Sequence, residues 1–232
     1  DARGTASARG EIVVLDGGYA YLEHDATTRF PLASHSVDWV FCEHFIEHIE
    51  PYQLGELLVE LRRLVRPGGT IRLSTPDLAL YMAGYVDPEQ RFFDSHRRVL
   101  ADYLVSESAW ARGVDQPVGA ERATSETMFW RNLSPGFEAT AGSGRELLDR
   151  ISGVLSTAFA RRAVMVNQIF RFYGHRWLYD HDELVHWADH AGFARGDIAV
   201  CGYREGRVAE LCALDQPFRR DESLYVELRC DA

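Results

Sequence analysis

The order of apolar and polar segments in residues 24–77 constrains the fold most strongly. An apolar run at 37–42 ends in Glu43-His44, and a segment with helical spacing of leucines follows at 51–65. Pro-Gly-Gly at 67–69 stops that segment, and another apolar run begins at once at 70–74. The pattern predicts strand, helix, strand, with polar residues at the strand ends. In an open α/β sheet, ligands bind outside those ends, so this stretch predicts both a fold and a site.

Further segments extend the α/β pattern on both sides. Short strands are expected at 12–15 and 19–23, a short helix near 77–85, a helix at 182–191, and strands at 198–202 and 223–230. Residues 86–172 show no strand pattern and are too long for a structureless loop. We therefore expect one doubly wound α/β domain over residues 1–232, with a helical insertion at 86–172 that forms a lid or substrate region.

Charge and composition exclude several classes of function. The net charge of −10 disfavours nucleic-acid binding, which needs a basic face. All 25 basic residues are arginines, so a lysine Schiff base is excluded. No apolar run is long enough to span a membrane. The four cysteines form no C-x-x-C pair, which favours a reduced, cytoplasmic setting. The first residue is Asp, and we expect the natural start to be missing.

Several motifs together resemble one enzyme family. They are E-H-F-I-E-H at 43–48, R-L-V-R-P-G-G at 63–69, T-P-D-L at 75–78 and G-H-R-W-L-Y-D at 174–180. In this order they resemble the class I S-adenosylmethionine (SAM)-dependent methyltransferases, and a small bacterial group of them in particular. The resemblance covers residues 12–85 and 167–230.

The resemblance implies a Rossmann-like methyltransferase fold, whose sheet is mostly parallel with an antiparallel last strand at 223–230. The strands at 12–15 and 19–23 resemble the second and third strands of that sheet. The implied cofactor is SAM. By the same resemblance Asp16 would bind its ribose hydroxyls, Asp25 with the backbone of Ala26 would hold the adenine, and Glu43 and His44 would lie beside the cofactor.

One family feature is absent from this sequence. The family's first strand is followed by a glycine-rich loop that packs against the methionine part of SAM, and nothing before Ile12 supplies it. We expect this loop to be missing by truncation. If the chain truly lacks it, the alternative is a methyltransferase-fold protein whose SAM site is lost or repurposed.

Methyl transfer needs in-line positioning, and a base when the nucleophile starts protonated. The candidate catalytic residues are His44, His175 and Asp77, which lie near strand ends or at the exit of the insertion. Each also has a structural interpretation: His175 as a hydrogen-bonded residue beside Trp177, and Asp77 as a helix cap. Asp25 likewise suits a local turn, and so does Asp16, which precedes Gly-Gly. The aromatic residues of the insertion line a lid or form a core of their own.

The predicted function is SAM-dependent methyl transfer to a small molecule, in secondary metabolism. A second alternative is a zinc hydrolase, because His44, Glu47 and His48 form H-x-x-E-H. Pro51 leaves little room for a long zinc-binding helix, so no metal is expected. The expected partner is a small-molecule substrate, without nucleic acid or membrane, and homodimer formation stays open.

Overall fold

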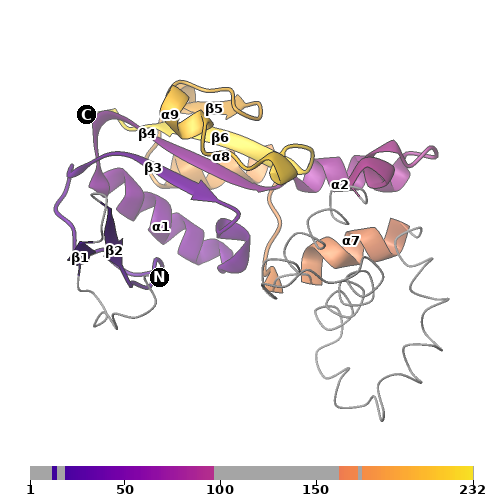
Figure 1. Cartoon of the computed structure of the whole chain (residues 1–232), viewed down its shortest axis with the longest axis horizontal. Coiled ribbons are helices and arrows are strands. Elements are labelled where there is room, and N and C mark those ends of the chain that lie inside the picture. The colour runs from indigo at the N-terminus through magenta and orange to yellow at the C-terminus, as the bar shows by residue number, and fades with distance from the viewer. Residues whose placement is uncertain (1–11, 15–18, 97–161, 172–173, 232) are drawn as a thin grey trace, which may run out of the picture.

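The computed structural model describes residues 12–14, 19–96, 162–171 and 174–231 (Figure 1). The strands are β1 (Ile12–Val14), β2 (Ala20–Leu22), β3 (Val37–Glu43), β4 (Val65–Pro76), β5 (Ile198–Cys201) and β6 (Ser223–Arg229). The α-helices are α1 (Pro51–Leu64), α2 (Leu78–Val86), α7 (Arg162–Arg171), α8 (His181–His190) and α9 (Ala209–Cys212). Three 3-10 turns are η2 (Ile46–His48), η4 (Arg195–Asp197) and η5 (Pro217–Arg219).

Four strands form the main sheet, in the order β3-β4-β6-β5. β3 and β4 are parallel, whereas β6 is antiparallel to both β4 and β5. Three strands therefore run in one direction and β6 runs against them. This confirms the predicted α/β fold, with its mostly parallel sheet and antiparallel last strand.

The prediction for the first two strands is wrong. β1 and β2 form a separate antiparallel pair, with Ile12 opposite Leu22 and Val14 opposite Ala20. Only residues 15–19 join them, and parallel neighbours need a crossover of about a dozen residues. Such a short connection allows only a hairpin, which lies at the opposite end of the molecule from α2 and α7 (Figure 1).

The main core lies between one face of the sheet and two helices. α1 buries Leu54, Leu57, Leu58, Leu61 and Leu64 on one side, as their helical spacing predicts. The backbone N–H of Glu50 donates to the Gln53 side chain and closes the first turn of α1. α8 lies beside α1, so a Cβ on Gly55 would meet the Trp187 ring at 2.9 Å. From the sheet, Ile71, Leu73, Val226 and Leu228 complete this core.

The opposite face of the sheet carries a buried charged group. The Arg72 guanidinium donates to Asp215 at 2.8 and 2.6 Å and to Glu227 at 3.1 Å. It also donates to the carbonyl oxygens of Gly202 and Glu205. All three charged side chains are fully buried. These contacts hold the segment between β5 and β6 against the sheet. The Arg72 side chain, on β4, binds two backbone carbonyl oxygens and the Asp215 carboxylate of that segment.

A second, smaller core joins the described part of the insertion to α2 and to Leu178. Tyr81 of α2 packs with Phe93, Met165, Ile169 and Leu178, and Phe92 borders the group. Residues 91–96 and α7 are helical, as expected, while 97–161 lie outside the described residues. Among the described aromatic residues of the insertion, Phe93 belongs to this core and Phe92 packs against it, whereas Phe170 is exposed. Within the described residues, no helix combines the length and apolar composition needed to cross a membrane.

Candidate functional site

His44 follows the last residue of β3 and adopts a left-handed backbone conformation, with φ of 47°. Its N–H donates to the carbonyl of Ser74 at 2.8 Å, which ties this turn to the end of β4. Its side-chain Nε2 lies 2.6 Å from the Ser223 hydroxyl oxygen at the start of β6. Positive φ is uncommon outside glycine and is often retained at functional sites. The turn thus fixes the imidazole at the carboxyl edge of the sheet.

Glu47 lies at the centre of this edge and is fully buried. Its Oε2 accepts a hydrogen bond from the Thr75 hydroxyl at 3.2 Å. Its Oε1 lies 3.1 Å from His44 Nδ1, within ion-pair distance, although neither atom makes a hydrogen bond. Burial raises the pKa of Glu47, yet the nearby His44 and His175 outweigh it, so the pKa lies below its usual value. The carboxylate form is therefore favoured.

His175 reaches the same place from the far side of the insertion. The carbonyl oxygen of Glu47 accepts hydrogen bonds from the N–H groups of Arg176 (2.7 Å) and Trp177 (3.3 Å), which holds this segment in place. His175 Nδ1 is hydrogen-bonded to the Ile169 carbonyl, and Nε2 lies 4.0 Å from Glu47 Oε1. Since a carbonyl only accepts, Nδ1 carries the proton and Nε2 the lone pair. Burial lowers the pKa of His175, although Glu47 opposes this.

A second polar group adjoins Ser223. The Tyr81 hydroxyl donates to Glu222 Oε2 at 3.0 Å and lies 2.9 Å from His96 Nε2. Arg219 donates to the other oxygen of Glu222 at 2.9 Å. Burial raises the pKa of Glu222, but His96, His44 and Arg219 outweigh it and lower the pKa overall. This buried network joins α2 and the 91–96 helix to the start of β6.

Unpartnered buried polar atoms gather at this end of the sheet. Among the described residues, five such side-chain atoms occur: His44 Nδ1, Glu47 Oε1, Ser74 Oγ, Tyr179 OH and Tyr225 OH. Ser74 lies at the end of β4 and pairs with both Glu43 and Tyr225, while Tyr179 bridges to Asp77. Buried polar atoms nearly always have partners, so this cluster is typical of a ligand site.

Two other predicted residues lie at the same edge with structural contacts. The Asp77 carboxylate accepts from the N–H of Ala79 at 2.9 Å and so caps α2. Burial raises the pKa of Asp77, and these backbone hydrogen bonds oppose the shift. Glu43 Oε1 accepts from the N–H of Gln216 at 3.0 Å. Asp77, Glu43, His44 and His175 are therefore brought together around the ends of β3 and β4.

The remaining predicted cofactor residues lie elsewhere. Asp25 Oδ1 accepts from the N–H and the hydroxyl of Thr27 at 3.0 and 2.7 Å, which forms a local turn. Ala26 borders a hollow of about 230 Å³ against Glu56 and Glu60 of α1. The structure thus places Asp25 and Ala26 along α1, not at the edge that holds His44. Asp16 lies outside the described residues.

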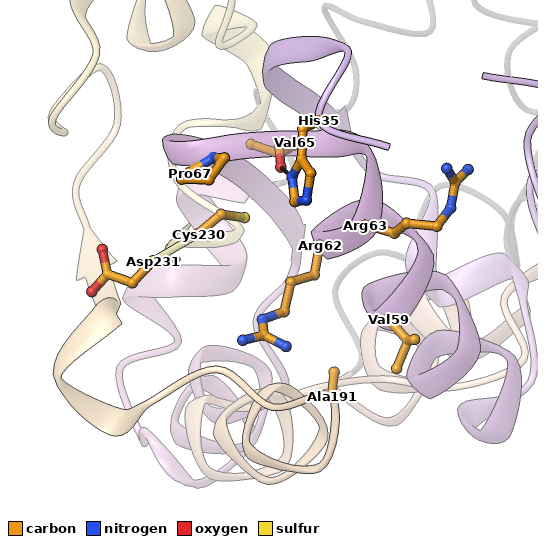
Figure 2. A pocket seen from close by; sticks show the side chains of 9 residues that line it. All are labelled: His35, Val59, Arg62, Arg63, Val65, Pro67, Ala191, Cys230 and Asp231. Atoms are coloured by element: carbon orange, nitrogen blue, oxygen red, sulfur yellow. Dashed lines mark hydrogen bonds between the residues drawn. The ribbon is translucent and has the colours of Figure 1, made fainter. Parts of the chain in front are cut away.

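A larger hollow, of about 660 Å³, lies at the other end of the sheet (Figure 2). Its lining comes from the end of α1, the start of β4 and the end of β6: His35, Val59, Arg62, Arg63, Val65, Pro67, Ala191, Cys230 and Asp231. None of the described predicted site residues lines it. Because α/β sheets bind ligands beyond the carboxyl ends of their parallel strands, the edge at His44 is the better candidate site.

The N-terminal third of the chain resembles a known family. Residues 2–73 match the model of a methyltransferase domain. This segment is therefore similar to the methyltransferase domain family. The match includes His44, Glu47 and the Pro-Gly-Gly segment at 67–69, which lies within β4 after the end of α1 at Leu64. It confirms the predicted resemblance to the class I SAM-dependent methyltransferases.

Other comparisons are distant. A possible exported protein from Bordetella parapertussis is 14% identical, with a TM-score of 0.38; the alignment covers 90% of this chain and 44% of that one. PKMT2 from Rickettsia typhi is 10% identical, also with a TM-score of 0.38, covering 90% and 38%. The chain thus spans less than half the length of either protein. No curated protein matches it.

Sequence reasoning missed Ser223, Thr75 and Glu222 as members of the site. Ser223 begins the alternating strand β6 and Glu222 precedes it, and nothing in that strand's pattern indicates its neighbours in the sheet. Thr75 stands beside Pro76 in a quoted motif, but its contact to Glu47 depends on the register of β3 and β4. One sequence signal could have found these residues. Polar residues follow β3 and β4 and begin β6, and these three strand ends meet at one edge of the sheet.

Proposed function

We propose that this chain is a SAM-dependent methyltransferase that acts on a small molecule. The observation that carries the proposal is the set of unpartnered buried polar atoms at the carboxyl edge of β3 and β4. It supports a polar ligand at the place where this domain family predicts one. Lost or repurposed SAM binding is the competing function, and the test below separates the two.

The residues at this edge suit part of SAM. Glu43 and His44 would lie beside it, and the Ser74 and Tyr225 hydroxyls can donate to or accept from its polar groups. Asp16 lies outside the described residues, and this sequence lacks the glycine-rich loop that would contact the methionine part. SAM supplies a methyl carbon on a positively charged sulfur; the acceptor's electron pair bonds this carbon while the carbon–sulfur pair returns to sulfur.

His44 is the proposed base. Its Nε2 and the Ser223 hydroxyl are 2.6 Å apart, so a proton leaving an acceptor hydroxyl or amine can pass through Ser223 to His44. In this proposal Asp77 and His175 have structural rather than catalytic roles, since Asp77 caps α2 and His175 is hydrogen-bonded to the Ile169 carbonyl. We place the acceptor in secondary metabolism.

Calorimetric titration with SAM and S-adenosylhomocysteine tests this function. We expect one molecule of either ligand to bind per chain. Glu43→Gln should weaken binding of both about tenfold, which corresponds to about 1.4 kcal/mol. Glu89→Gln, in an exposed turn, is the matched control and should bind like the wild type. If neither ligand binds to the full-length protein, including any segment that precedes Asp1, the proposal is refuted in favour of the lost or repurposed site.

A further inference from the structure

The structure assigns a divalent transition-metal site, of the zinc class, to Glu47, His48 and His175. Each residue offers one ligand atom, and these atoms all lie within 4.8 Å of one another. Two imidazole nitrogens and one carboxylate oxygen are a donor set used by catalytic zinc sites. This inference does not rest on methyl transfer.

The orientation of Glu47 supports a cation at this point. Its Oε2 is held by Thr75, which turns Oε1 toward the histidines, 4.0 Å from His175 Nε2. Oε1 is buried and makes no hydrogen bond, although His44 Nδ1 lies 3.1 Å from it. A buried carboxylate oxygen without a hydrogen bond is costly, and a bound cation would reduce that cost.

The surroundings of His175 have the form seen around metal-binding histidines. Such a residue commonly donates its second ring N–H to a backbone carbonyl, which fixes the tautomer and the ring. Here Nδ1 is hydrogen-bonded to the Ile169 carbonyl oxygen, and Nε2 lies 4.0 Å from Glu47 Oε1. The rings of His175 and His48 meet edge to face, with centroids 4.9 Å apart.

Metal binding requires the three ligand atoms to lie closer together than they do in this structure. Zinc bonds of about 2.0–2.2 Å put tetrahedral ligand atoms roughly 3.4 Å apart. The three ligand atoms must therefore move together by about 1 Å, through rotation of the partly exposed His48 and small shifts of the others. Three protein ligands leave a fourth position for water or a ligand oxygen, as in catalytic rather than structural zinc sites.

This ligand set differs from the one that H-x-x-E-H suggested. The inverzincin arrangement needs two histidines on one face of an α-helix, but Ile46–His48 is a 3-10 turn and His44 precedes it with positive φ. The third ligand comes from His175, beyond the insertion. It is brought there by the backbone hydrogen bonds to Glu47.

Titration of the metal-free chain with Zn²⁺, followed by calorimetry, and with Co²⁺, followed by its visible d–d absorption, tests the site. We expect one high-affinity ion per chain. His48→Asn and His175→Asn should each weaken binding roughly 100-fold, since even outer partners change affinity 10–100-fold. The control is His186→Asn/His190→Asn, an exposed pair on α8 with ring centroids 4.9 Å apart, which should keep the high-affinity ion.

Circular dichroism and thermal unfolding must show that each variant is folded. If His175→Asn does not fold, His48→Asn still decides the matter, because His48 is partly exposed. The inference is overturned if the wild type binds no stoichiometric ion. It is also overturned if folded His48→Asn binds as tightly as the wild type, or if only the α8 pair variant loses the ion.

Discussion

The Nε2 atom of His44 and the hydroxyl oxygen of Ser223 lie 2.6 Å apart, although 179 positions separate them in the chain. The pairing exists because β6 enters the sheet beside β4 and starts where β3 and β4 end. It couples the turn after β3 to the last strand of the domain.

Ser223→Ala should destabilise the chain by about 1–3 kcal/mol. The change removes the partner of the buried His44 Nε2, and an unpaired buried polar atom costs about this much. Urea unfolding measures the effect. Ser36→Ala is the control, because Ser36 is exposed and bonds only locally to the Ala33 carbonyl; it should cost less. Equal losses for the two variants would contradict a special role for the His44–Ser223 contact.

Arg72→Met should cost on the order of 3–5 kcal/mol, because it leaves Asp215 and Glu227 as buried charges without their cation. Arg66→Met is the matched control. Arg66 pairs with Asp38 at the surface, where both side chains are more than half exposed, so its loss should cost less than about 1 kcal/mol. Denaturant midpoints at neutral pH compare them. A small effect at Arg72 would mean that the carboxylates find other partners.

His96→Gln should make the chain less sensitive to acid. Burial lowers the pKa of His96 below its ordinary value of 6.5; Glu222 and Asp221 oppose this shift, while Arg219 adds to it. As the pH falls below 6.5, His96 therefore becomes protonated in the unfolded chain before it does so in the folded chain. The stability that His96 contributes falls as the pH drops toward its folded pKa, by at most about 1.4 kcal/mol per pH unit.

Urea unfolding of the wild type and His96→Gln between pH 7.5 and 5 checks this. Tyr81→Phe separates titration from lost contacts, since it removes the hydroxyl near His96 but keeps the imidazole. Tyr81→Phe should lower the free energy of unfolding at every pH, while the change of that free energy with pH stays as in the wild type. If the free energy of unfolding of His96→Gln changes with pH as it does in the wild type, His96 does not cause the loss of stability in acid.

Gly69→Ala should be more disruptive than Gly68→Ala. A Cβ on Gly69 would lie 2.4 Å from the Asp38 carbonyl oxygen, so β3 and β4 would have to separate; we expect a loss of more than about 2 kcal/mol. At Gly68 a Cβ meets nothing within 4 Å, and only its φ of +80° is strained, at a cost of about 1 kcal/mol. Thermal unfolding ranks the two variants. The reverse order would contradict the close approach of β3 to this turn.

Local patterns predicted the elements well where each pattern has a local cause. The leucines of α1 repeat at helical spacing, Asp77 caps α2, and Asp180 caps α8 through the N–H of Glu183. The hairpin at 12–22 was predicted to be two strands of the main sheet. That prediction gave more weight to the family resemblance than to the length of the connection between the strands. Five intervening residues already excluded parallel pairing.

The sequence by itself determined the α/β class, the strand–helix–strand unit and the polar residues that follow β3 and β4, because periodicity and caps act over a few residues. Only the tertiary structure decided that Ser223 lies against His44, that His175 reaches Glu47, and that Asp25 lies apart from both. Those relationships depend on sheet order and on backbone hydrogen bonds between distant segments. Neither leaves a local trace in the sequence.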